Sequence, residues 1–343
     1  MNHRWLFSLS DINSLRVRHI HMRLFKQQLQ AHQQYLPVYL LIVNGFLIAL
    51  MLSLAKEVTT HGIPPITYAF WQTFIAGSIL FLFSLKGKIQ LNRHLFIYFV
   101  ISGLSGIAVP NAIAFYLVTQ IGAGFTGIMY ALPPIFTFLI TTSLGLEALN
   151  IKKLIGLCIA VMACSWIMLQ RYSEAGDEGA LWYALGMMIP LMLSIGNVYR
   201  SVAWPKGIKS MPLAAGTLLA SALSLGVFAS LNNNELVSAE FSLASQAMIL
   251  MQGFLTALTY FCTFELLKRS DPVFTSQLGS VAAVFGLVIG SVWFKEVYSM
   301  QIYLGVLMVI LGLRMSNKAS IQKLPLLKKI EKQNHKSKEL LIK

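Results

Sequence analysis

Residues 131–139 read ALPPIFTFL, and two adjacent prolines interrupt what is otherwise a long apolar segment. Proline has no amide hydrogen and clashes with the carbonyl four residues earlier, so Pro133 and Pro134 free the carbonyl groups of Met129 and Tyr130. In hydrocarbon an unpaired carbonyl is costly, and such a break persists only where protein or a water-filled cavity satisfies the backbone. The stretch therefore predicts a membrane-spanning helix that faces other helices or a polar cavity.

The composition of the whole chain is that of a multi-span membrane protein. Charged residues make up 12% of the chain, hydrophobic residues 56%, and the mean hydropathy is +0.66; soluble proteins carry about 25% charged residues. A membrane-spanning helix needs about 20 mostly apolar residues. Segments of this kind cover residues 37–55, 65–85, 95–118, 122–145, 151–169, 180–199, 212–231, 246–267, 272–294 and 298–315. The expected fold is an all-α integral membrane protein with ten transmembrane helices.

The positive charges predict how these segments cross the membrane. The chain has 27 lysines and arginines. If the N-terminus is cytoplasmic, all but three of them fall on the cytoplasmic side, and the exceptions are Lys56, Arg171 and Lys295. Cytoplasmic loops of membrane proteins are enriched in lysine and arginine. We therefore expect both termini in the cytoplasm, and the protein in the inner (cytoplasmic) membrane of the cell. The net charge of +14 then reflects topology and contact with anionic membrane lipid, and no nucleic-acid partner is expected.

The boundaries of the spans divide the chain into four regions. These are a basic cytoplasmic N-terminal tail at 1–36, a five-helix unit at 37–170, a second five-helix unit at 179–315 and a basic cytoplasmic C-terminal tail at 316–343. The three cysteines all lie within spans and show no CxxC spacing, so free buried thiols are expected rather than a disulfide framework or a metal site. No cofactor is expected.

The two units are related by an internal repeat. Shifting the chain by 149 residues aligns 112–163 with 261–312 without a gap. The identical pairs include Phe115 and Phe264, Phe136 and Phe285, Ile140 and Ile289, Glu147 and Glu296, and Gly156 and Gly305. Because each unit has five spans, an odd number, the second unit must enter the membrane from the opposite side. Inverted repeats of this kind are typical of transporters with a binding site near the middle of the bilayer.

These residues resemble a known family. The proline-centred helix followed by GLEAL and IGLCIAVM, with WFKEV and LGVLMVIL in the second unit, resembles the drug/metabolite transporter (DMT) superfamily with its pair of EamA-type domains. The resemblance covers roughly 37–315 and implies two inverted EamA-like five-helix repeats around a substrate cavity. The third, fourth, eighth and ninth helices would surround it with the first and sixth. Members often carry Arg-Phe in the second helix, whereas this chain reads FWQTF at 70–74.

The fourth span carries a polar face. Thr126, Tyr130, the proline pair, Thr137 and Thr141 recur every three to four residues and so share one side of a helix. Their repeat equivalents on the ninth span are small: Thr275, Gly279, Ala282 or Ala283, Gly286 and Gly290. The fourth span is interpreted as a cavity wall of hydroxyls and freed carbonyls. The small face of the ninth span favours close helix packing.

The eighth span carries a second polar face, with Gln252, Thr256, Thr259 and Thr263 beside Tyr260. Such a face belongs inside a bundle, although hydroxyls can also bond to their own helix. The predicted substrate cavity comprises Asn44, Asn111, Tyr130, Pro133, Pro134, Thr137, Asn197, Gln252, Thr256, Tyr260 and Gln277. Glu265, with Lys268 and Arg269 after it, is a candidate for an interfacial salt bridge or for proton coupling.

A cavity rich in hydroxyl, amide and aromatic groups but poor in charge suits a neutral, zwitterionic or amphipathic small molecule, such as an amino acid. We therefore expect a secondary transporter, with efflux as the direction that the family resemblance implies. The expected partners are a small-molecule substrate and membrane lipid, with a homodimer as an open alternative. A membrane scaffold or assembly protein is the rival interpretation. An intramembrane enzyme is less favoured, because no HExxH or GxSxG motif is present.

Overall fold

The computed structural model describes residues 35–55, 63–85, 91–114, 116–117, 129–170, 180–232, 236, 242–293, 295 and 299–321. Most of both expected tails, together with Thr126 and Glu296, lies outside these residues. Over the described ranges the chain is helical and contains no strand. The expected all-α class is therefore confirmed.

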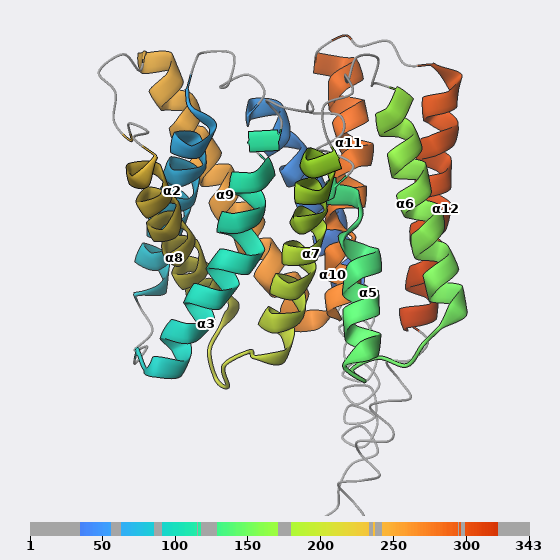
Figure 1. Ribbon diagram of the computed structural model, residues 1–343, viewed down its shortest axis with the longest axis horizontal. Coiled ribbons are helices and arrows are strands. Elements are labelled where there is room, and N and C mark those ends of the chain that lie inside the picture. The colour runs from blue at the N-terminus through green and yellow to red at the C-terminus, as the bar shows by residue number, and fades with distance from the viewer. Residues whose placement is uncertain are drawn as a thin grey trace, which may run out of the picture.

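The helices form one upright bundle (Figure 1). Their bounds are Tyr35–Ala55, α2 Pro65–Ser84, α3 Arg93–Gly103, the π-helical turn η1 Leu104–Ala108, α5 Pro133–Ser143, α6 Ile151–Gln170, α7 Ala180–Val202, α8 Ser210–Leu231, α9 Leu243–Arg269, α10 Pro272–Ser276, α11 Leu278–Trp293 and α12 Met300–Ile321. Within the described ranges, six helical segments are long and apolar enough to cross a membrane. They are Tyr35–Ala55, Pro65–Ser84, Arg93–Ala114, Ser210–Leu231, Leu243–Arg269 and Pro272–Trp293.

Several helices begin where the sequence supplies a cap or a proline. The Asn92 side chain accepts a hydrogen bond from the Leu95 amide at the start of α3, and Asp271 accepts one from the Phe274 amide at the start of α10. Such caps satisfy amide groups that the first turn of a helix leaves unpaired. Pro65 at the start of α2 loses nothing there, because that position has no helical hydrogen bond to make.

Polar and apolar residues are distributed as expected for a protein surrounded by hydrocarbon. Large apolar side chains such as Phe83, Leu223 and Val292 are exposed on the outside of the bundle. Threonines and amides are instead buried between the helices, including Thr67, Thr73, Thr217 and Gln252. Because lipid tails do not drive helices together, small residues and interhelical hydrogen bonds must hold the bundle.

Helices from the two halves of the chain pack against one another. α6 lies along α12, and α2 lies along α8 and α9. Gly156 on α6 and Gly312 on α12 bring these two backbones together: a Cβ atom at Gly156 would lie 2.8 Å from the Gly312 carbonyl oxygen. The absence of a side chain at these positions is therefore what allows the close approach.

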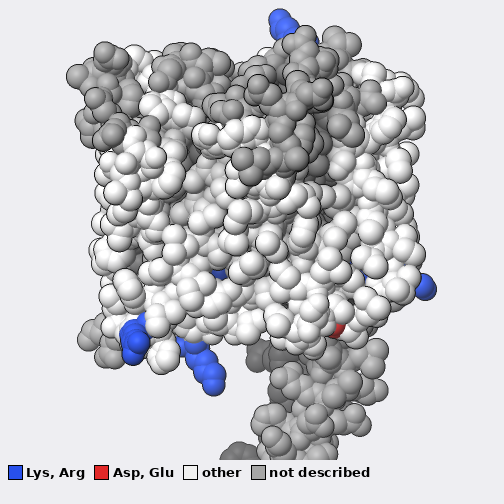
Figure 2. Space-filling view, viewed as in Figure 1, with Lys and Arg blue, Asp and Glu red and all other residues white. Residues whose placement is uncertain are grey.

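The two ends of the bundle differ in charge. The connection from α5 to α6 lies at the lower end in Figure 1, whereas α11 ends and α12 begins at the upper end. Figure 2 shows the blue lysine and arginine atoms mostly at that lower end. Glu147, in the α5–α6 connection, and Lys295, which follows α11, therefore lie at opposite ends of the bundle.

Candidate functional site

The first polar contact inside the bundle joins the helix Tyr35–Ala55 to α9. Asn44 is completely buried, its amide nitrogen donates to the Thr259 carbonyl at 3.1 Å, and its amide oxygen accepts from the Thr263 hydroxyl at 2.8 Å. One amide thus satisfies two groups on α9. Because an unpaired amide is costly in hydrocarbon, this contact holds the two helices in one register.

A second contact joins α2 to α9. The Gln252 amide nitrogen donates to the Gln72 amide oxygen at 3.0 Å, and both side chains are buried. The Gln252 amide oxygen has no hydrogen-bond partner. One helical turn later, the Thr256 hydroxyl lies 4.0 Å from the Met51 sulfur, which is a weak acceptor. This part of the bundle therefore offers one buried acceptor, the Gln252 amide oxygen, that protein atoms leave unused.

A third contact lies at the broken helix. The Tyr130 hydroxyl donates to the Asn111 amide oxygen at 3.1 Å. Tyr130 also lies within electrostatic range of Tyr260 on α9. The helices that contribute the expected third, fourth and eighth spans are thereby brought together through side chains that the sequence patterns indicate.

The structure shows how protein atoms meet the carbonyls around the proline pair. Ser194 on α7 donates its hydroxyl to the Pro133 carbonyl at 3.0 Å. The Tyr130 carbonyl, freed by Pro134, lies directly against Gly279 of α11, so closely that a Cβ atom there would overlap it. The Tyr130 oxygen thus has a backbone neighbour from the second half of the chain, and the lining of a cavity by the freed carbonyls stays a prediction. Close packing accounts for the small face of α11 at this point.

Two of the predicted residues lie apart from these contacts. Gln277, between α10 and α11, is completely buried and donates to the Ser316 hydroxyl of α12 at 3.2 Å. Thr137 on α5 is also completely buried, and its hydroxyl has no partner. The Gln277 contact belongs to the packing of α12.

The predicted ion pair of Glu265 involves one of its two candidate cations. The Glu265 carboxylate accepts from the Arg269 Nε at 3.0 Å and from its Nη2 at 2.7 Å. Lys268 is exposed and makes no such contact with Glu265. Both partners of the pair lie in the last two turns of α9, where a basic residue also complements the helix dipole.

Part of the chain matches a known protein family. Residues 36–169 match the model of the EamA-like transporter family. These residues are similar to an EamA-like transporter domain. This family is part of the DMT superfamily, so the resemblance inferred from GLEAL and IGLCIAVM is confirmed for the matched residues. With six candidate spans and an EamA-like domain, the chain is a multi-pass membrane protein.

The fold also has a solved counterpart. A structure known only as "Crystal structure of protein" superposes with a TM-score of 0.69 at 15% identity, over 86% of this chain and 99% of that one. At this identity the likeness concerns the fold alone. No curated protein matches the chain.

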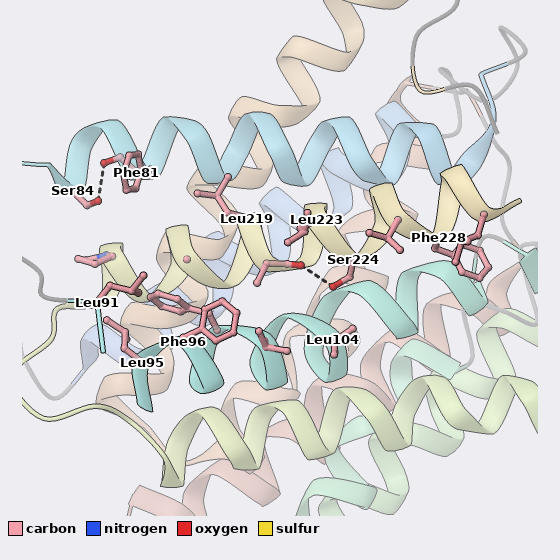
Figure 3. A pocket seen from close by; sticks show the side chains of 17 residues that line it. Phe81, Ser84, Leu91, Leu95, Phe96, Leu104, Leu219, Leu223, Ser224 and Phe228 are labelled. Carbon is pink, nitrogen blue, oxygen red and sulfur yellow. Dashed lines mark hydrogen bonds between the residues drawn. The ribbon is translucent and has the colours of Figure 1, made fainter. Parts of the chain in front are cut away.

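The EamA-like domain also contributes to an apolar groove on the outside of the bundle, with a volume of about 840 Å³ between α2, α3 and α8 (Figure 3). Its wall is formed by side chains such as Phe96, Leu104 and Leu223. The two serine hydroxyls at the groove bond to carbonyls of their own helices, Ser84 to Phe81 and Ser224 to Ala220. Both hydroxyl donors of the groove are thus already used, and the rest of its lining is apolar, so the polar interior is the better candidate site for a polar ligand.

Sequence reasoning left two residues of that interior out of the predicted cavity. Gln72 lies in the FWQTF stretch, where the sequence shows only a departure from the family pattern. Arg200, three residues after the half-buried Asn197, lies near membrane depth by its position in the sequence, but no motif assigns it to the site. The available signal was an amide or a cation within an apolar segment, which by itself is a reason to expect function.

Proposed function

We propose that this protein is a secondary transporter of the DMT type that moves a small neutral, zwitterionic or amphipathic metabolite, amino-acid-like in chemistry, out of the cell. The observation that carries the proposal is the match of residues 36–169 to the EamA-like transporter family. The proposal includes alternating access across the cytoplasmic membrane, with both termini on the cytoplasmic side.

The packing of the helices supports an inverted repeat as the basis of the mechanism. α12 begins at Met300, the residue onto which the shift of 149 places Ile151 at the start of α6. α6 packs on α12, and the expected second and seventh spans, α2 and α8, also pack on each other. Pairs of repeat equivalents in mutual contact are what a two-fold axis between the halves would produce.

Further helix contacts agree with this relation. α2 packs on α9, and the equivalent pair under the repeat, α8 and α3, is also in contact. α5 packs on α7, and its equivalent is the pair formed by α11 and the N-terminal helix, where the Phe46 and Phe285 rings lie 5.5 Å apart. Two units with matching neighbours can rock against each other between two similar arrangements, one open to each side.

The polar interior supports a small-molecule substrate. The contacts Asn44 to Thr263 and Gln72 to Gln252 each join one half to the other. Groups on both sides of a moving interface can bind a substrate in one state and exchange partners in the other. A scaffold protein needs no such exchange, and the members of the EamA-like family are transporters rather than enzymes. We further propose that the protein contacts membrane lipid, can form a homodimer and needs no cofactor.

Transport by the purified protein in proteoliposomes tests the proposal. A panel of metabolites would be screened by counterflow, in which an internal unlabelled compound drives uptake of its labelled form. We expect exchange of at least one small zwitterionic or neutral compound, abolished when the protein is omitted. Failure of every compound in the panel to exchange, with correctly folded protein, would contradict the proposed function.

Cysteine accessibility tests the location of the cavity. In a variant without native cysteines, Asn111→Cys, Tyr130→Cys and Thr256→Cys should react with a small charged thiosulfonate, and a transported compound should slow the reaction. Leu223→Cys on the apolar groove is the control, because its outward-facing side chain should lie in lipid and stay unreactive. Equal reactivity at all four positions would remove these residues from the cavity.

A further inference from the structure

Two cations are almost completely buried among the described residues, Lys153 and Arg200, with exposed fractions of 1% and 2%. The Lys153 amine is 2.8 Å from the Glu147 carboxylate. Arg200, in contrast, has no carboxylate partner within the described part of the chain, and its Nε has no hydrogen-bond partner. A buried charge without a counter-charge is strongly unfavourable, so it is a functional residue by default.

The surroundings of Arg200 are aromatic and closely packed. Its guanidinium lies 5.7 Å from the centre of the Phe264 ring. It also packs against Gly106 in the π-helical turn η1, so closely that a Cβ atom on residue 106 would overlap it. Single π-helical turns of this kind are frequent at functional sites. Phe264 offers the cation a favourable ring face but no negative charge.

A second unpartnered donor belongs to the same buried cluster as Phe264, the ring that Arg200 faces. Tyr98 on α3 is 1% exposed, its hydroxyl has no hydrogen-bond partner, and it lies within electrostatic range of Arg200, as does Tyr260. Buried hydroxyls and guanidinium groups nearly always have partners in native proteins. Two such groups in one place indicate a partner that the described part of the chain does not supply.

The C-terminal dipole of α7 does not replace that partner. Arg200 lies in the last turn of α7, where the free carbonyls carry about half a negative charge. These carbonyls offset part of the charge of Arg200. A full negative charge within reach of the guanidinium would still be required for balance.

We propose that Arg200 binds the carboxylate group of the transported metabolite, with the Tyr98 hydroxyl as a second donor. The inference rests on the proposed function and specifies its substrate as a carboxylate-bearing zwitterion. A single carboxylate matches the single charge of Arg200, whereas a phosphate ester would bring a second negative charge that no other buried, unpaired cation in the described ranges could balance. The planar guanidinium also suits the two oxygens of a carboxylate.

The position of Arg200 fits the cytoplasmic loading of an exporter. The residue lies in the last turn of α7, which packs on η1 and on α9, and α7 ends at the lower end of the bundle (Figure 1), where the described cations gather (Figure 2). A shift of α7 away from η1 would uncover the guanidinium to the cytoplasm. Tyr98, on the neighbouring helix α3, would then lie at the same opening.

Binding to the full-length protein in lipid nanodiscs tests the inference. The probes are L-leucine, L-methionine and L-phenylalanine, each paired with its amide, together with inorganic phosphate. At least one acid should bind at least tenfold more tightly than its amide and than phosphate. Equal binding of acids and amides, no binding of any acid, or preferential binding of phosphate would each overturn the carboxylate site.

Variants separate a binding role from a structural one. Arg200→Gln should weaken binding of the acid at least tenfold, and Arg200→Lys should weaken it less, because lysine keeps the charge but not the planar fork. Arg314→Gln on the exposed face of α12 is the matched charge-loss control and should bind as the wild type. Unchanged binding by Arg200→Gln would contradict the inference.

Tyr98→Phe tests the site without the risk that a loss of binding only reflects misfolding. It removes a hydroxyl that has no partner in the protein, so thermal stability should be retained or increased, while binding of the acid should weaken about three- to tenfold. Loss of stability without a change in binding would show that Tyr98 is structural and overturn its assignment as a donor.

Transport measured on the same preparations distinguishes the two proposals. Binding that depends on Arg200 without exchange of the bound acid would contradict the proposed transporter and leave the carboxylate site intact. Exchange that is unaffected by Arg200→Gln would contradict the carboxylate site at Arg200 and leave the proposed transporter intact.

Discussion

Gly279 on α11 lies against the main-chain carbonyl of Tyr130, the group that the proline pair removes from the helical hydrogen-bond pattern. The glycine lets a second backbone cover this oxygen, and its Cα–H can act as a weak donor. The contact with α11, a helix of the other half of the chain, thereby lowers the free energy that the lost helical hydrogen bond of Tyr130 would otherwise cost.

Gly279→Ala is therefore expected to destabilise the protein by about 1–3 kcal/mol, because the added methyl group cannot fit without moving the Tyr130 carbonyl. Thermal unfolding in detergent would measure the change. Gly286→Ala is the control on the same helix, since a Cβ atom there meets nothing within 4 Å. Similar losses in both variants would contradict the role of Gly279.

Gln72 and Gln252 provide a second test at the level of residues, because they bond across the two halves at 3.0 Å. Replacing either by alanine leaves the other buried without its partner, which should cost about 1–3 kcal/mol. In a double-mutant cycle the coupling should be about 1 kcal/mol, the range found for hydrogen bonds between membrane helices. Additive single effects would show that the bond is not formed.

At the scale of elements, a buried lysine links two connections. The Lys153 amine at the start of α6 lies 2.8 Å from Glu147 in the α5–α6 connection and 3.6 Å from Asp271 at the start of α10. Asp271 also caps α10 through the Phe274 amide. One cation thus ties the hairpin of the first half to the α9–α10 junction of the second.

Lys153→Met should destabilise the protein by about 1–3 kcal/mol. This lies between the small values for exposed ion pairs and the larger ones for fully buried pairs, because Glu147 is itself 17% exposed. Arg269→Gln serves as the control: its pair with Glu265 is an i,i+4 pair in which Arg269 is exposed, so a loss below about 0.5 kcal/mol is expected. Equal losses would show that Lys153 does not link the two connections.

The elements were largely predictable from the sequence, and their partners were not. Each expected span overlaps a described helix, since about 20 apolar residues in a row have few other structures in a membrane. The contact of Gly279 with the Tyr130 carbonyl needs the angle and distance between two helices, which periodicity does not contain. Gln277 is polar like the residues of the predicted cavity. It lies at the break between α10 and α11, however, and helical periodicity across that break does not predict which helix it contacts. Arg200 shows the same limit, because the absence of a counter-charge is visible only in three dimensions.

For the whole molecule, the proposed mechanism requires that the two halves have opposite orientations. The α5–α6 connection and the end of α11 lie at opposite ends of the bundle (Figure 1), and the positive charges gather at the end with the α5–α6 connection (Figure 2). Under the positive-inside rule we expect this end to face the cytoplasm. The repeat would then place a similar hairpin on each side of the membrane, and rocking of the halves would open the polar interior alternately.

The most direct test is the sidedness of the two hairpins. In a cysteine-free variant, with Cys158, Cys164 and Cys262 replaced by alanine, Leu149→Cys and Ser299→Cys introduce single exposed thiols at the two ends of the bundle. A membrane-impermeant maleimide applied to intact spheroplasts should label Ser299→Cys at once and Leu149→Cys only after permeabilisation. Labelling of both positions from the same side would contradict the inverted arrangement and, with it, the alternating-access mechanism.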